Sequence, residues 1–209
     1  MATIPRTPFV PVPLPLADGP PRERADAACN RARALDAAAE LFARRGIEHV
    51  SMDAVAAAAG VGKGTLYRRF GDRSGLALAL LDERERAFQE ATLRGPPPLG
   101  PGAPPVERLV AYFDACFDFL DANTPLSLAA QGGPAGGRYR GAVYAARHRH
   151  VSLLLAQALP DADAGVLAHT LLAPVVADLH RHLRDDLGLE LARVKAAQAR
   201  LVRALVPRS

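Results

Sequence analysis

The sequence has 209 residues, of which 49% are hydrophobic and 23% are charged, and its formal net charge is +4. The hydrophobic fraction is too high for a chain that is disordered throughout, and two cysteines are too few for a disulfide scaffold. No apolar run of about 18 residues is present, so we expect no membrane-spanning helix and a cytoplasmic protein.

Residues 1–21 are apolar but rich in proline. Prolines at positions 11, 13 and 15 prevent the helix that a secretory signal needs. We therefore interpret residues 1–21 as a disordered, extended tail.

The part of the chain that follows, up to residue 93, is predicted to be helical. Gly46 suits a left-handed C-terminal stop, while Ser51 and Asp72 suit N-caps. The predicted helices cover residues 22–45, 52–59, 63–70 and 73–93. Between Arg22 and Phe70, nine basic residues stand against six acidic ones, and this is where a polyanionic partner is expected.

A segment rich in proline and glycine follows at residues 94–105. Nine of its twelve residues are Gly or Pro, so it predicts a domain boundary or at least a long loop between helices. Beyond it, the predicted helices cover residues 106–120, 125–131, 138–159, 162–186 and 189–205. Pro160 and Gly188 separate the last three, and Pro174 is expected to kink the helix over 162–186 without ending it. No stretch alternates with period two for long enough to be a strand, so the predicted fold is all-α.

Residues 51–70 have the pattern of a helix-turn-helix. Ala56 is small enough for a close helix contact, and Gly60 tolerates the positive φ that the turn needs. Val61 and Leu66 supply the apolar face. The second helix carries hydroxyl-bearing and basic side chains and no acidic one.

Such a helix enters the major groove of duplex DNA, where phosphate contacts supply affinity and base contacts supply discrimination. Gly62 and Gly64 leave the start of this helix open, so that backbone N–H groups can approach a phosphate. The candidate DNA-binding residues are Ser51, Val61, Gly62, Lys63, Gly64, Thr65, Tyr67, Arg68 and Arg69.

Three spaced motifs over residues 31–80 carry a family resemblance. They are Leu35-x-x-Ala38-x-x-x-Phe42-x-x-x-Gly46, Ser51-x-x-x-Val55-Ala56-x-x-Ala59-Gly60-Val61 and Gly64-Thr65-Leu66-Tyr67-Arg68-Arg69-Phe70. In order and spacing they resemble the N-terminal domain of the TetR family of transcriptional regulators.

The resemblance implies a dimeric, repressor-like protein in which Tyr67 and the basic residue at position 69 contact the DNA backbone. It also implies a C-terminal domain that binds a small effector and forms the dimer. Two departures stand out. Gly62 replaces the usual Ser or Thr cap and loses one phosphate contact, while Arg69 stands where His is commoner and adds to backbone affinity.

In the C-terminal half, four of the eleven aromatic residues fall within residues 112–119. Such a cluster forms either plain core or the wall of a ligand pocket, because the two share side chains in a helical effector domain. The candidate ligand-binding residues are Tyr112, Phe113, Cys116, Phe117, Tyr144, His148, His169 and Thr170. Cys116, on an apolar helix, is expected to be a buried small hydrophobe.

The last two predicted helices carry broad apolar stripes. One stripe consists of Leu167, Leu171, Val175, Leu179 and Leu183, and the other of Leu187, Leu191, Val194, Leu201 and Leu205. Helices of this kind either cap their own core or pair with a second copy. We expect a homodimer through the last two helices.

Two other patterns suggest phosphate or metal binding, but the spacing of their residues does not fit either. The string Gly60–Thr65 lacks the Ser or Thr that a phosphate-binding loop needs directly after its lysine. His148 with His150, and His180 with His182, are two residues apart and point away from each other on a helix, so we interpret them as surface or dimer-rim histidines. We expect no catalytic residues, no metal site and no cofactor.

The sequence therefore predicts a DNA-binding domain over residues 22–75 and a helical effector-binding and dimerisation domain over residues 76–209. The predicted function is a ligand-responsive transcriptional regulator, not an enzyme, that a small-molecule effector releases from a double-stranded DNA operator. The alternative is a helical small-molecule-binding protein or enzyme without sequence-specific DNA binding.

Overall fold

The computed structural model describes residues 21–130 and 141–205, and all regular elements within these ranges are helical. The elements are α1 (Pro21–Arg45), the short 3-10 turn η1 (Ile47–His49), α2 (Met52–Ala59), α3 (Lys63–Phe70), α4 (Arg73–Arg94), α5 (Pro105–Ala129), α7 (Ala142–Ala158), α8 (Ala164–Leu172), α9 (Ala177–Arg181), the π-helical turn η2 (His182–Asp186) and α10 (Leu191–Leu205). The predicted all-α fold, with an N-terminal helix-turn-helix and a helical C-terminal part, is confirmed. No helix of the described ranges is long and apolar enough to cross a bilayer. The predicted tail lies outside the described residues, except for Pro21.

Two of the predicted helix starts in the N-terminal part are confirmed by capping contacts. The hydroxyl of Ser51 accepts the N–H of Ala54 at 3.1 Å, and the carboxylate of Asp72 accepts the N–H of Gly75 at 2.9 Å. Gly46 has the expected positive φ of 78°, but its ψ of 149° is extended, so it turns the chain into η1 without forming a left-handed helical cap.

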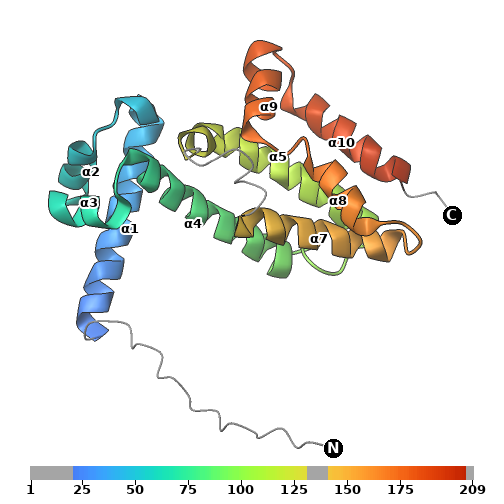
Figure 1. Cartoon of the computed structure of the whole chain (residues 1–209), viewed down its shortest axis with the longest axis horizontal. Coiled ribbons are helices and arrows are strands. Elements are labelled where there is room, and N and C mark those ends of the chain that lie inside the picture. Colours follow the sequence, from blue (N-terminus) through green and yellow to red (C-terminus); the bar gives the residue numbers. More distant parts are fainter. Residues whose placement is uncertain (1–20, 131–140, 206–209) are drawn as a thin grey trace, which may run out of the picture.

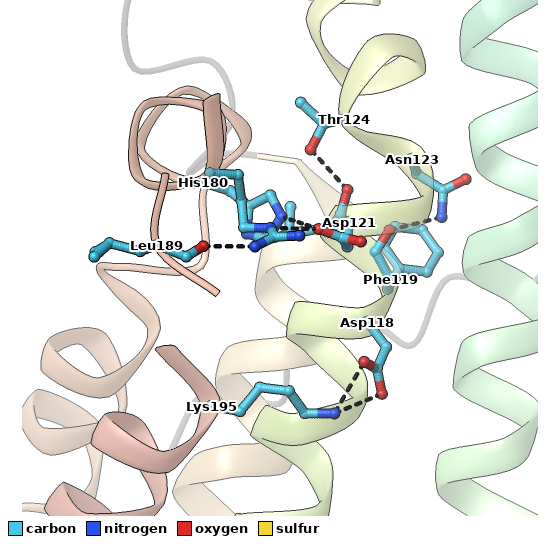
Figure 2. A network of polar contacts seen from close by, with 10 residues as sticks. Asp118, Phe119, Asp121, Asn123, Thr124, His180, Leu189 and Lys195 are labelled. Carbon is cyan, nitrogen blue, oxygen red and sulfur yellow. Dashed lines mark hydrogen bonds and ion pairs between the residues drawn. The ribbon is translucent and has the colours of Figure 1, made fainter. Parts of the chain in front are cut away.

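Pro125 lies inside α5, so the separate helix predicted over residues 125–131 is wrong. Proline cannot donate the hydrogen bond that a helix normally makes at this position. In the turn before this proline, the side chains of Asn123 and Thr124 donate hydrogen bonds to the carbonyls of Phe119 and Leu120, both at 2.7 Å (Figure 2). Burial of Leu126 in the N-terminal core holds the last turn of α5 in line.

Pro174 ends a helix, so the single kinked helix predicted over residues 162–186 is also wrong. α8 stops at Leu172, and a tight turn, in which the N–H of Val175 bonds to the carbonyl of Leu172 at 2.9 Å, leads into α9. Val175 packs against the apolar side chains on both sides of this turn. The missing N–H and the ring of proline oppose a continuous helix here, and the packing of Val175 favours the break.

The molecule has two packing units, which Figure 1 shows as a head of α1–α3 and a body of α5–α10. The head core consists of residues from α1 to the first turns of α4, including Leu35, Val55, Leu66 and Leu76, together with Leu126 of α5. In the body, α5 is central and packs against α4, α7, α9 and α10. α4 belongs to both units, since Leu80 lies in the head core and Phe88 packs on the body core. The segment 94–105 joins α4 to α5, which pack on each other, so it is a loop between helices within the body.

Candidate functional site

The turn between α2 and α3 has the geometry of a helix-turn-helix. Gly60 is left-handed, with φ 61° and ψ 37°, and its N–H bonds back into α2. Ala56 and Leu66 are buried at the contact between the two helices. From α1, the guanidinium of Arg33 donates to the carbonyl of Gly60 at 3.3 Å, so the first helix holds the turn in place.

The structure brings the predicted DNA-binding residues together on one exposed end of the molecule. In Figure 1, α2 and α3 lie on the side of the head that faces away from α7–α10. Eight of the nine residues are exposed: Ser51, Gly62, Lys63, Gly64, Thr65, Tyr67, Arg68 and Arg69. The ninth, Val61, is half-buried against the head core. Tyr67 is notable because a large aromatic side chain that is 48% exposed has no packing role to explain it.

Two of the basic side chains are held in position by neighbours. Lys63 forms an ion pair with Asp53 of α2, which raises the pKa of this lysine and keeps it protonated. The guanidinium of Arg69 donates to the carbonyl of Ala27 in α1 at 2.9 Å, which leaves its other N–H groups available. A Cβ built on Gly64 meets no atom within 4 Å, so the first turn of α3 is open to a macromolecular surface.

We predict that Gly62→Ser strengthens both α3 and its contact with DNA. Gly62 is the N-cap of α3 and makes no side-chain cap. Its backbone lies in the extended region, with a φ of −64° that any residue can adopt. A serine hydroxyl there is expected to add a few tenths of a kcal/mol of stability and to raise DNA affinity about threefold through one more phosphate hydrogen bond. Thermal melting and DNA titration measure the two effects. Gly62→Ala is the control, because it adds Cβ without the hydroxyl, and equal behaviour of both variants would contradict the prediction.

An exposed basic helix after a left-handed glycine turn, fixed on a helical scaffold, defines a helix-turn-helix protein. Residues 34–80 match the family described as "Bacterial regulatory proteins, tetR family". The match covers the helix-turn-helix of this chain and the start of α4.

Known regulators are similar to this chain over different parts of its length. An HTH-type transcriptional regulator of Staphylococcus aureus is 40% identical over 65 residues, which are 31% of this chain and 35% of the relative. The match thus spans about a third of the curated relative's length. Two solved structures are similar over most of the chain. A TetR-like transcriptional regulator from Rhodococcus sp. RHA1 is 25% identical with a TM-score of 0.57, covering 84% of this chain and 95% of that one. The transcriptional regulator FadR from Bacillus subtilis, in complex with stearoyl-CoA, is 16% identical with a TM-score of 0.58, covering 82% and 96%.

The body contains a cavity of about 490 Å³ between α4, α5, α7 and the α8–α9 turn. Its walls are mainly apolar, with Leu78, Leu81, Phe119, Leu120, Val143 and Val175 among the lining residues. Three charged side chains also line it: Asp82, Glu85 and Arg147. Leu81 packs on the head core as well, so one wall of the cavity is continuous with the helix-turn-helix domain.

The predicted ligand-binding residues are divided between cavities and core. Tyr144 lines the large cavity, and Tyr112 lines a second one of about 70 Å³. Phe113, Cys116 and Phe117 are buried in the body core and line neither of these cavities. As expected for a buried residue, desolvation raises the pKa of the Cys116 thiol, to about 11.

Of the other three predicted residues, His148 and His169 lie beside Tyr144. Its hydroxyl hydrogen-bonds the Nδ1 of His169 at 2.7 Å, and the rings of His148 and His169 are 4.0 Å apart. His169 and Thr170 are exposed on α8. The sequence interpretation missed Asp82, Glu85 and Arg147, although acidic residues that interrupt the apolar face of a long helix are a visible signal.

Glu85 and Arg147 form a buried ion pair at 2.6 Å that separates the two cavities. The guanidinium of Arg147 also lies over the rings of Phe88 and Phe119, 5.4 Å from each centroid. Each charge of this ion pair therefore has a partner, and both side chains are fixed in position.

A polar network ties the C-terminal elements to α5 (Figure 2). The Nε2 of His180 and the guanidinium of Arg184 lie 3.1 and 3.0 Å from the same carboxylate oxygen of Asp121, while Lys195 contacts both oxygens of Asp118 at 2.9 Å. Desolvation opposes ionisation of Asp121, but its two partners lower the pKa of this carboxyl group. The expectation of a surface histidine is wrong for His180, which is buried against Phe117 while its Nε2 contacts the exposed carboxylate of Asp121. No cluster of three potential metal ligands occurs among the residues that the structure describes.

We predict that the protein loses stability in mild acid because of His150. Its ring packs on Tyr112, its Nε2 is buried without a hydrogen bond, and burial together with the charge of Arg108 lowers its pKa to about 4. The unfolded chain binds the proton near pH 6.5, so the stabilisation is complete above about pH 6.5 and is lost as the pH falls towards 4. We expect the melting temperature of His150→Phe to fall less than that of the parent between pH 7 and pH 5. An equal fall in the melting temperatures of the two proteins between pH 7 and pH 5 would contradict this prediction.

Proposed function

We propose that this protein is a transcriptional regulator that binds operator DNA as a homodimer and is released by a small-molecule effector. The observation that carries the proposal is the exposed face of α3, where Lys63, Thr65, Tyr67 and Arg68 are accessible on a rigid helix. Phosphate contacts from such side chains position a recognition helix, whose first turn then reads bases in the major groove. We place this activity in the cytoplasm, where bacterial operator DNA lies.

Dimerisation is proposed through the C-terminal elements. Large apolar side chains are exposed there on α8, on α9, in the segment between η2 and α10, and on α10 itself: Val166, Leu179, Leu187 and Leu201, in that order. A two-fold interface would cover them and would hold two copies of α3 about 34 Å apart, the spacing of successive major grooves. Analytical ultracentrifugation of the full chain tests this part of the proposal.

Effector binding is proposed in the large cavity. FadR from Bacillus subtilis, which has a similar fold, binds stearoyl-CoA, and the cavity here has the size and apolar walls typical of small-molecule sites. α4 offers the connection to DNA binding, because Leu81 lines the cavity and also packs on the head core. A ligand that binds more tightly to one of two positions of α4 shifts the protein towards that position. This shift changes the distance between the two recognition helices.

The second candidate is a helical small-molecule-binding protein or enzyme that does not recognise DNA. The cavity favours it, but the exposed Tyr67 and the open start of α3 have no role in such a protein. Footprinting on the DNA upstream of the protein's own gene, at low and moderate salt, decides between the two. A protected site of two half-sites one helical turn apart is the expected result, and no protection by correctly folded protein would overturn the proposal.

A further inference from the structure

We propose that the large cavity takes an apolar molecule that carries a cationic group, with Asp82 as the counter-ion. This inference rests on the proposed function, since it names the chemical class of the effector. It follows from the charges in the cavity wall, from the one carboxylate of α4 that has no partner among the described residues, and from the position of Arg147.

Among the described residues that line the cavity, the charges do not cancel. The charged ones are Asp82, Glu85 and Arg147. Glu85 and Arg147 neutralise each other in a buried ion pair at 2.6 Å. One negative charge, that of Asp82, therefore faces a mostly apolar space, where a ligand can exclude water and strengthen an electrostatic contact.

Asp82 differs from the neighbouring carboxylates of α4. Glu83 pairs with Arg31 at 3.0 Å, and Glu90 pairs with Arg94 at 2.7 Å. Asp82 is half-buried and lines the cavity, yet no residue that the structure describes forms a hydrogen bond or an ion pair with it. A half-buried carboxylate without a partner gains most from a cation that brings its own apolar body into the cavity.

An anionic ligand is disfavoured by the same geometry. Among the described lining residues Arg147 is the cationic side chain, and it is committed to Glu85 and to the rings of Phe88 and Phe119. A carboxylate that captured Arg147 would leave Glu85 buried and unpaired, which is strongly destabilising. It would also lie near the negative charge of Asp82.

An aromatic side chain in the wall favours a cation further. Tyr144 lines the cavity, and the face of an aromatic ring attracts a positive charge. A quaternary ammonium or amidinium group on an aliphatic or aromatic body combines all these contacts.

The test compares three probes of equal chain length: octyltrimethylammonium, octanol and octanoate. Isothermal titration calorimetry on the full chain is expected to show that the ammonium probe binds about tenfold more tightly than octanoate, which corresponds to about 1.4 kcal/mol. Asp82→Asn is expected to remove this preference and to leave the affinity for octanol unchanged. Glu90→Gln, which removes an exposed carboxylate of α4 outside the cavity, is the matched control and is expected to bind like the parent.

Equal binding of octanoate and the ammonium probe, a preference that survives Asp82→Asn, or no binding of any probe would each overturn the inference. Operator titration in parallel separates it from the proposed function. Release of DNA by octanol or octanoate, without an advantage for the cation, would leave the regulator proposal standing and refute the cationic class. A cation preference that depends on Asp82, in a protein that binds no operator, would support the cationic class and refute the regulator proposal.

Discussion

Tyr67→Ala and Lys63→Ala are each expected to weaken operator binding about tenfold, because each removes one hydrogen bond to a charged phosphate. Both side chains are exposed on α3 and neither belongs to the head core, so helicity and the dimer are expected to remain unchanged. Lys63→Ala is further expected to lower the slope of log affinity against log salt by about one, since one fewer phosphate is neutralised. Fluorescence anisotropy over a salt series measures both quantities.

Arg94→Ala is the control for these two variants. Arg94 is exposed like Lys63 and also forms an ion pair, with Glu90, but it lies at the opposite end of α4 from the head. Its replacement is expected to leave operator binding within twofold of the parent, because it makes no contact with DNA in the proposed complex. Parent-like affinity of both Tyr67→Ala and Lys63→Ala would show that α3 is not the recognition helix.

Gly60→Val is expected to unfold the head domain and to abolish operator binding. Gly60 has a φ of 61°, a region that is costly for any side chain and most of all for a β-branched one. In addition, a Cβ at this position would lie 2.5 Å from the guanidinium nitrogen of Arg33, which would lose its hydrogen bond to the turn. Strain of this kind costs about 1–3 kcal/mol before the displacement of Arg33 is added. Thermal melting followed by circular dichroism measures the loss.

Gly64→Ala is the matched control in the same motif. Gly64 lies in α3 with an ordinary helical backbone, and an added Cβ would meet no atom within 4 Å. Alanine there is expected to stabilise α3 by up to about 1 kcal/mol, since glycine is a poor helix former. If Gly60→Val melted like the parent, the tight turn would have to lie elsewhere.

The sequence by itself determined the helix-turn-helix, because its geometry depends on local spacing. Gly60 must adopt a positive φ four residues after the small Ala56, and Ser51 must cap a helix three residues before the N–H that it binds. Each of these requirements involves residues within one or two turns, so a pattern in one sequence reveals them. For the same reason the exposure of the α3 residues could be predicted.

Only the tertiary structure decided the C-terminal half. Two prolines on apolar helices have opposite outcomes: Pro125 is kept inside α5, with Leu126 buried beyond it, while Pro174 ends α8 next to Val175, which packs on both sides of the break. The cavity likewise joins Asp82 to Arg147, residues that are far apart in the chain. Contacts at such separations depend on how whole helices pack, and helical periodicity fixes which face is apolar without fixing which partner covers it.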